Sequence, residues 1–170
     1  MPVAGYDLTF SPVKSVSALW AITPRELAAT IAACHDEAVR HTIAWLEKHA
    51  AYTRRGTDGV AQVDTTGLIA AAFTHRDSRA ADPDAHARRG QQQGLHPGRA
   101  VASLDGRALY RNKVTASEHY NTRLETLLIE RIGVRFTDRG EAAEGRREVR
   151  EIADFHPSCC APGRRAGPTS

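Results

Sequence analysis

Two histidines, His75 and His86, are the residues whose types and spacing most suggest metal chemistry in this 170-residue chain. They lie eleven positions apart, and Asp82-Pro83 between them could turn the chain back on itself. A protein metal site usually needs at least three ligands. The position two residues after His86, on the same face of a strand, holds Arg88, which repels a cation and does not deprotonate. The spacing alone therefore completes no metal site, and two surface histidines are the simpler interpretation.

Two charged residues near the N-terminus could also take part in chemistry. Asp7 is a carboxylate in an otherwise apolar, strand-like run, which indicates either a functional group or an edge position. Lys14 lies in the first turn of a predicted helix, where free backbone N–H groups favour anions. Neither residue by itself identifies a reaction.

Capping signals and amphipathic periodicity predict three helices. The first spans residues 13–22, and the second, which is the longest, begins with a capping box at Thr23. A second capping box at Thr115 predicts the start of the third helix, and Gly133 predicts its end. Each long helix carries one apolar stripe for packing.

Alternating residues and turn signals predict several strands. Residues 3–11 alternate as a half-buried strand does, and residues 56–59 have the composition of a hairpin turn between two short strands. The apolar run 67–73 fits either a strand or a buried helical turn, and residues 134–136 and 149–152 are candidate strands. Helices and antiparallel strands together predict an α+β fold.

Two segments match no element of such a fold. Residues 85–102 contain three consecutive glutamines and neither helical nor strand periodicity, so we expect them not to supply a core strand. Residues 156–170 are rich in proline, glycine and arginine and lack acidic residues, which predicts a disordered tail. The expected organisation is a single incomplete domain over residues 1–155, followed by this tail.

Composition sets the broad class of protein. The chain is 41% hydrophobic and 25% charged, which is typical of a globular domain. No run approaches the roughly 18 apolar residues of a membrane span, and no signal-peptide profile is present, so we expect a cytoplasmic protein without a membrane segment. Three cysteines form no C-x-x-C motif, and a net charge of +3 allows a nucleic-acid partner without requiring one.

Four motifs occur in a fixed order along the chain. They are Gly5-Tyr-Asp-Leu-Thr-Phe-Ser-Pro-Val-Lys-Ser-Val-Ser17, Phe73-Thr-His-Arg-Asp-Ser-Arg79, Asp82-Pro-Asp84 and Ser103-Leu-Asp-Gly-Arg-Ala-Leu-Tyr110. Together they closely resemble the conjugative relaxases of the TrwC/TraI type over most of residues 4–153. The resemblance implies a relaxase-like two-layer sandwich, in which helices flank an antiparallel sheet. It also implies single-stranded DNA at a plasmid transfer origin as partner, and a divalent metal, Mg²⁺ or Mn²⁺, held by three histidines. Such enzymes nick the DNA through a tyrosine that becomes joined to the 5′ phosphate.

The resemblance assigns roles to individual residues. Asp7 resembles the carboxylate that orients and helps deprotonate the tyrosine, while His75 and His86 resemble the first and second metal ligands. The expected contacts to DNA phosphates are Lys14, Arg76 and Arg79.

Two departures from the family pattern predict that the chain does not nick DNA by itself. The family's nucleophilic tyrosine lies upstream of the Gly-Tyr-Asp motif, and Tyr6, Tyr52, Tyr110 and Tyr120 match no nucleophile position. Arg88 stands where the third histidine is expected. The hypotheses are therefore an inactive relaxase fragment, a non-catalytic remnant that binds single-stranded DNA, or a non-functional pseudogene product.

The composition of residues 85–102 leads to a reading-frame hypothesis. Synonymous codons exist for these residues that, read in another frame, encode His-Thr-His-Val-Ala-Val-Ser-Asn, which resembles the family's strand. Codons for residues 157–169 likewise permit a family-like peptide. Under this hypothesis the match at His86 is coincidental, and the DNA sequence of the gene provides the test.

Overall fold

The structure is a computed structural model that describes residues 5–77, 83–95, 101–138 and 149–155. Within these ranges, residues 74–77, 83–95 and 101 are described by their backbone alone. The elements in chain order are β1 (Leu8–Phe10), α1 (Lys14–Ile22), α2 (Arg25–His49), β2 (Tyr52–Arg55), η1 (Thr57–Gly59), β3 (Ala61–Asp64), β4 (Gly67–Asp77), β5 (Pro83–Leu95), β6 (Val101–Ser103), α3 (Gly106–Ile132), β7 (Phe136–Asp138) and β8 (Arg150–Ile152).

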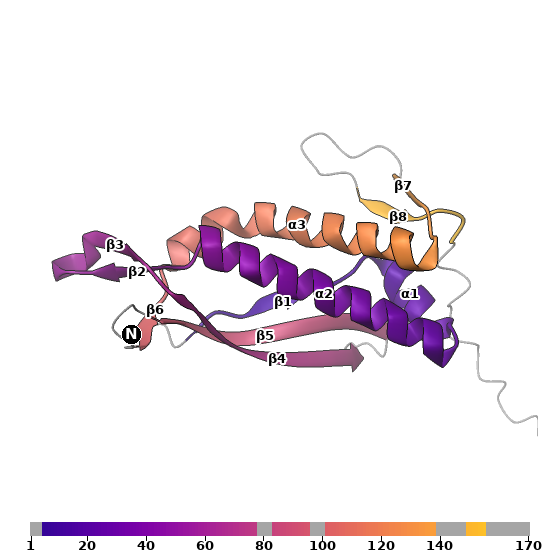
Figure 1. Ribbon diagram of the computed structural model, residues 1–170, viewed down its shortest axis with the longest axis horizontal. Coiled ribbons are helices and arrows are strands. Elements are labelled where there is room, and N and C mark those ends of the chain that lie inside the picture. The colour runs from indigo at the N-terminus through magenta and orange to yellow at the C-terminus, as the bar shows by residue number, and fades with distance from the viewer. Residues whose placement is uncertain (1–4, 78–82, 96–100, 139–148, 156–170) are drawn as a thin grey trace, which may run out of the picture.

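An antiparallel sheet of β1, β4, β5 and β6 forms one layer of the molecule (Figure 1). β5 is its centre, with β4 paired along one edge and both β1 and β6 paired along the other. β1 pairs with residues 87–89 and β6 with residues 93–95, so the two short strands follow one another along the same edge of β5.

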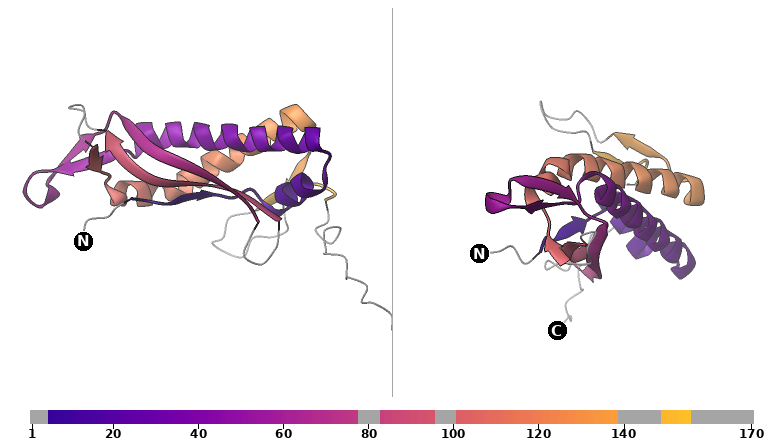
Figure 2. Two further views of the ribbon diagram at one scale, coloured as in Figure 1. Left: turned by 90° about the horizontal axis from the view of Figure 1, so that it is seen from below. Right: turned by 60° about the vertical axis from the view of Figure 1, so that its left-hand side comes forward.

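The two long helices, α2 and α3, form the second layer on one side of this sheet (Figure 2). Their facing apolar stripes make the core, which extends to the sheet where the rings of Phe10 and Tyr120 lie 5.3 Å apart. Cys34, Ala38 and Val39 are fully buried in α2. The other buried apolar residues of the two helices are Ile31, Ile43, Leu46, Leu109, Ala116, Leu124, Leu127 and Leu128.

Hydrogen bonds between Ser15 and two residues of β8 connect the short β7–β8 hairpin to the start of α1. The Glu151 carboxylate accepts hydrogen bonds from the backbone N–H and the hydroxyl of Ser15. The Ser15 hydroxyl oxygen in turn accepts the backbone N–H of Ile152 at 2.9 Å. Because Ser15 is buried, each of these polar groups needs a partner inside the protein.

The observed helix starts differ from the predicted ones. α3 begins at Gly106 rather than Thr115, because Asp105 caps it by accepting the backbone N–H of Arg107 at 3.0 Å. At the start of α2, Thr23 makes no capping bond to the helix; its N–H instead closes α1 on Leu19 O. The predicted stop of α3 is confirmed, since Gly133 has φ +78° and donates its N–H to Ile129 O.

The strand predictions are confirmed with one exception. The two hairpins form as β2–β3 and β7–β8, and the apolar run 67–73 begins strand β4. The expectation that residues 85–102 supply no central strand is wrong, because β5 pairs with three other strands through this segment. The hydrogen bonds between strands are made by the backbone and need no particular side-chain pattern. A segment without strand periodicity can therefore form the central strand β5. The predicted tail lies outside the described residues.

Histidine and tryptophan rings gather where α2 and α3 pack together. The ring of His119 stacks on His41 at 5.0 Å between centroids and on Trp45 at 5.6 Å. Its buried Nδ1 has no hydrogen-bond partner among the described residues. Burial, together with the positive charges of His41, Arg123 and His49, lowers the pKa of His119 below its ordinary value of 6.5.

Acidification is therefore expected to destabilise the fold through His119. The unfolded chain takes up a proton near the ordinary pKa, whereas the folded chain resists protonation until lower pH. The stability present above about pH 7.5 is lost as the pH falls through 6.5 towards the folded pKa. Thermal unfolding between about pH 8 and pH 5.5, followed by circular dichroism, should show a smaller decline in Tm for His119→Phe. An unchanged pH slope in that variant contradicts the assignment.

Within the described part of the chain, no helix has the length and apolarity to cross a membrane.

Candidate functional site

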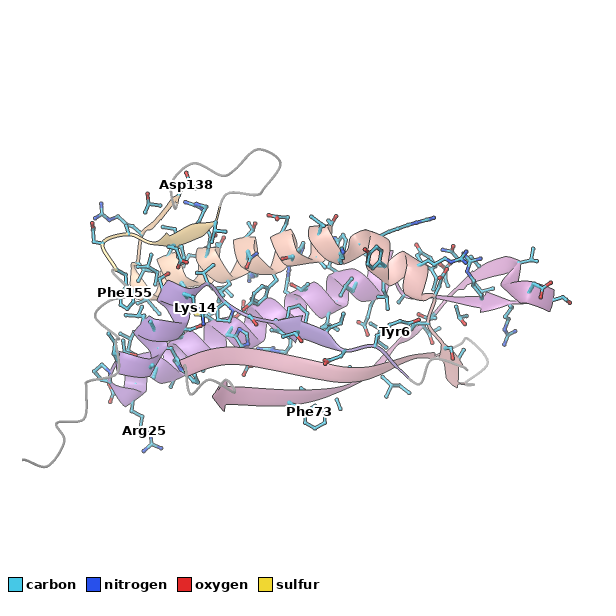
Figure 3. All side chains as sticks on the ribbon, turned by 180° about the vertical axis from the view of Figure 1, so that it is seen from behind. Tyr6, Lys14, Arg25, Phe73, Asp138 and Phe155 are labelled. Atoms are coloured by element: carbon cyan, nitrogen blue, oxygen red, sulfur yellow. The ribbon has the colours of Figure 1, made fainter. Side chains whose placement is uncertain are left out.

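The face of the sheet turned away from the helices carries the exposed residues nearest to the predicted site. Asp7 and Thr9 are exposed, whereas the alternate residues Leu8 and Phe10 pack in the core. This alternation places Asp7 and Thr9 on the face of the sheet away from the helices, which we call the open face. Phe73 in β4 is 57% exposed, and its side chain points away from the layer of α2 and α3 (Figure 3).

Strand register brings the separate motifs together on the sheet. Arg88 in β5 lies opposite Thr9 on one side and Phe73 on the other. The register continues without a shift to His75, which lies directly opposite His86. Residues that oppose one another in antiparallel strands share a face, as do residues two apart in one strand. Positions 9, 73, 75, 86 and 88 therefore belong to one face.

Tyr6 helps fix the start of β1, the strand that directly follows Asp7. Its hydroxyl donates to Leu104 O at 3.3 Å. The ring lies so close to Gly106 that a Cβ there would meet Tyr6 Cζ at 2.8 Å. Only glycine allows this approach, so the first residue of α3 and the start of β1 are positioned together.

A groove of about 190 Å³ lies beside the predicted carboxylate, between β1 and the helices. Asp7 and Lys113 both line it, with Ser117 and Tyr120 deeper along α3. The Lys113 ammonium lies 4.0 Å from the centroid of the Tyr110 ring, so this cation rests on an aromatic face at the groove.

Asp105 connects the β2–β3 hairpin to α3. It is 7% exposed, and its carboxylate accepts the side chain of Arg54 at 2.8 Å as well as the Arg107 N–H. Its own N–H donates to Tyr52 O at 2.7 Å. Burial acts to raise the pKa of Asp105, but the hydrogen bonds from Arg54 and Arg107 outweigh it, and the pKa is lower than usual.

The four tyrosines all lie in the described part of the chain, and each contacts different surroundings. Tyr120 is buried with its hydroxyl 2.8 Å from His35 Nδ1, and burial raises its pKa, which disfavours the phenolate. Tyr6 is held against Leu104, and Tyr110 lies on the outer side of α3 beside Lys113. Tyr52 is half-buried in β2.

The predicted phosphate contacts are spread over the structure. Lys14 begins α1, a helix that contacts β5, and Arg76 follows His75 in β4. Arg79 lies outside the described residues. The sequence did not single out Phe73 or Thr9 as site residues. Phe73 could have been found because it is an aromatic residue two positions before His75 in the same strand, which places both on one face.

Comparison with known proteins identifies the family. A sequence model of the TrwC relaxase family matches residues 1–162. The chain belongs to the TrwC relaxase family. No curated protein sequence matches it significantly.

Solved structures of the conjugative relaxase TrwC share the fold. A copper-bound complex with oriT DNA gives a TM-score of 0.72 and 26% identity, covering 88% of this chain and 48% of that one. A metal-bound complex with oriT DNA gives a TM-score of 0.69 and 27% identity, with coverages of 88% and 49%. TrwC with a 27-mer DNA comprising the recognition hairpin and the cleavage site gives 0.70 and 27%, with coverages of 88% and 50%. The α+β prediction is confirmed, and the chain spans about half the length of these TrwC chains.

The residues of this TrwC-family chain do not fit a metal ion held by three histidines. His75 and His86 oppose one another, but the next position of β5 on the same face is Arg88. Arginine has no lone pair to offer a metal and carries a permanent positive charge. Among the side chains that the structure describes, no group of three histidines, cysteines or acidic residues is placed to hold a metal ion.

Proposed function

We propose that this chain binds single-stranded DNA of the transfer-origin type across the open face of its sheet, and that it does not cut the strand. The observation that carries the proposal is the register that places Phe73, Arg88 and Thr9 in one line across three strands, beside His75 and His86. The TrwC structures described above are complexes with DNA, two of them with oriT DNA, which supports the choice of ligand.

The exposed residues of this face suit a flexible single strand. A base stacked on an exposed aromatic ring contributes about 1–3 kcal/mol, and stacking tolerates any sequence. Phe73 offers such a ring, whereas arginine supplies the positive charge that phosphates need. In this proposal Phe73 holds a base, and Arg88, which lies opposite it in the adjoining strand β5, contributes charge.

The proposed absence of cutting rests on the surroundings of the tyrosines in this chain. Transesterification by a tyrosine needs a phenol that can approach the phosphate and lose its proton. Tyr120 is buried with a raised pKa, and Tyr6 bonds to Leu104 on the core side of β1. Tyr110 lies on α3, in the layer away from the open face. Asp7 is exposed, and Tyr120, which lines the same groove, is the buried tyrosine with the raised pKa.

Fluorescence anisotropy with a labelled single-stranded oligonucleotide tests the binding. Phe73→Ala is expected to weaken binding by roughly 5- to 100-fold, because one base loses its stacking partner. Tyr110→Ala is the matched control, since Tyr110 is an aromatic residue with 68% exposure on the helix layer. Its affinity should equal that of the unmodified chain.

The same protein distinguishes the remaining hypotheses. Incubation with transfer-origin DNA and Mg²⁺ or Mn²⁺, followed by denaturing electrophoresis, should show no covalent adduct. An adduct contradicts the absence of cutting. Failure of the unmodified, folded chain to bind any single strand contradicts the whole proposal and favours a non-functional product.

A further inference from the structure

We propose that Arg88 takes the place of a metal ion in this chain, so that the site beside His75 and His86 holds a DNA phosphate without a divalent cation. This inference rests on the proposed binding of single-stranded DNA and specifies how one phosphate is held. It assigns the chain a phosphate-binding position that departs from the metal-bound state of its relatives.

The first step is the location of position 88 on the sheet. Its two partners across the strands are Thr9, which is exposed, and Phe73, whose ring is 57% exposed on the open face. Because opposed residues share a face, position 88 belongs to the open face. The register continues without a shift through the pair Thr74 and Ala87. It therefore places His75 and His86 two residues further along the same face.

The second step is the chemistry of the residue at that position. A guanidinium group is charged at every physiological pH and presents a planar set of N–H donors that matches two phosphate oxygens. A divalent cation at the same place would be repelled by it and would find only two ligands in the opposed histidines. Arg88 thus supplies the positive charge that a metal ion would otherwise place beside a phosphate.

The neighbouring residue, Arg89, supplies a matched control. It has the same charge in the same strand, but its partner in β1 is Leu8, which packs against the core. Successive residues of a strand alternate between faces, so positions 88 and 89 belong to opposite faces of the sheet. Only Arg88 is expected to contribute to the open face.

The first measurement is the salt dependence of binding to a labelled mixed-sequence single strand, with and without EDTA. The unmodified chain should bind equally in both conditions. Arg88→Ala should weaken binding and lower the salt slope by about 0.7, the value for one lost phosphate contact on a single strand, whereas Arg89→Ala should keep the slope. Loss of binding in EDTA, or equal slopes for the two variants, overturns the inference while leaving DNA binding itself established.

The second measurement uses metal alone and does not depend on DNA. Isothermal calorimetry with Mn²⁺ and the absorption spectrum of added Co²⁺ should show no site in the unmodified chain. Arg88→His, which adds a third imidazole at this position, should create one. Equal binding to both proteins, or binding to neither, contradicts the inference, and circular dichroism verifies that each variant is folded.

Discussion

Asp105→Ala is expected to lower the free energy of unfolding by about 3 kcal/mol. The loss of a helix N-cap costs about 1 kcal/mol, and the loss of a hydrogen bond to a charged partner costs about 1.5–3 kcal/mol. Asp105 makes both interactions, with the Arg107 N–H and with Arg54, from a buried position. Urea denaturation followed by circular dichroism at neutral pH measures the change.

Asp105→Asn separates the two contributions. Asparagine caps a helix about as well as aspartate does, but it lacks the charge that pairs with Arg54. It should therefore keep part of the stability that alanine loses. The stability that depends on the lowered pKa of Asp105 is present above its unfolded pKa and is lost as the pH falls through the lower, folded value. Equal stability of the unmodified chain and the alanine variant contradicts the role assigned to this residue.

Leu127→Ala is expected to destabilise the protein by about 3–4 kcal/mol, which is near the middle of the range for leucine truncation in a core. Leu127 is 1% exposed on α3 and belongs to the core cluster that α2 and α3 share. Removal of its side chain leaves a cavity that two packed helices fill only in part. The midpoint of urea denaturation should fall accordingly.

Ile129→Ala provides the control for Leu127→Ala. Ile129 lies in the same helix with 45% exposure, so its truncation changes helix propensity slightly and leaves the packing between the helices intact. The expected loss is under about 1 kcal/mol. Equal losses in the two variants contradict the placement of the core between α2 and α3.

The helices were predictable because their signals are local. The stripe containing Ile31, Cys34 and Ala38 repeats at helical spacing, and all three residues are buried. The start of α3 was missed because Asp105-Gly106 has the composition of a turn, although Asp105 accepts the nearby Arg107 N–H as a helix cap. Asp105 also pairs with Arg54 from the distant β2–β3 hairpin. Tertiary partners of this kind leave no mark on local periodicity.

The candidate site was only partly predictable. The motifs identified Asp7, His75 and His86, and the register brings the two histidines opposite one another. The alignment of Phe73 and Thr9 with Arg88 could not be predicted, because it arises from pairing between strands that are far apart in the sequence. The reading-frame origin of residues 85–102 stays a prediction, which the gene sequence will test.

The central place of β5 has a consequence for the order of synthesis. β1 leaves the ribosome before its partner residues 87–89, which follow only after α1, α2 and the β2–β3 hairpin have been made. At about 5–20 residues per second, β1 waits for about 4–16 s before it can pair. Throughout that interval the nascent chain carries an unpaired strand, the kind of segment that invites chaperones or neighbouring chains to bind.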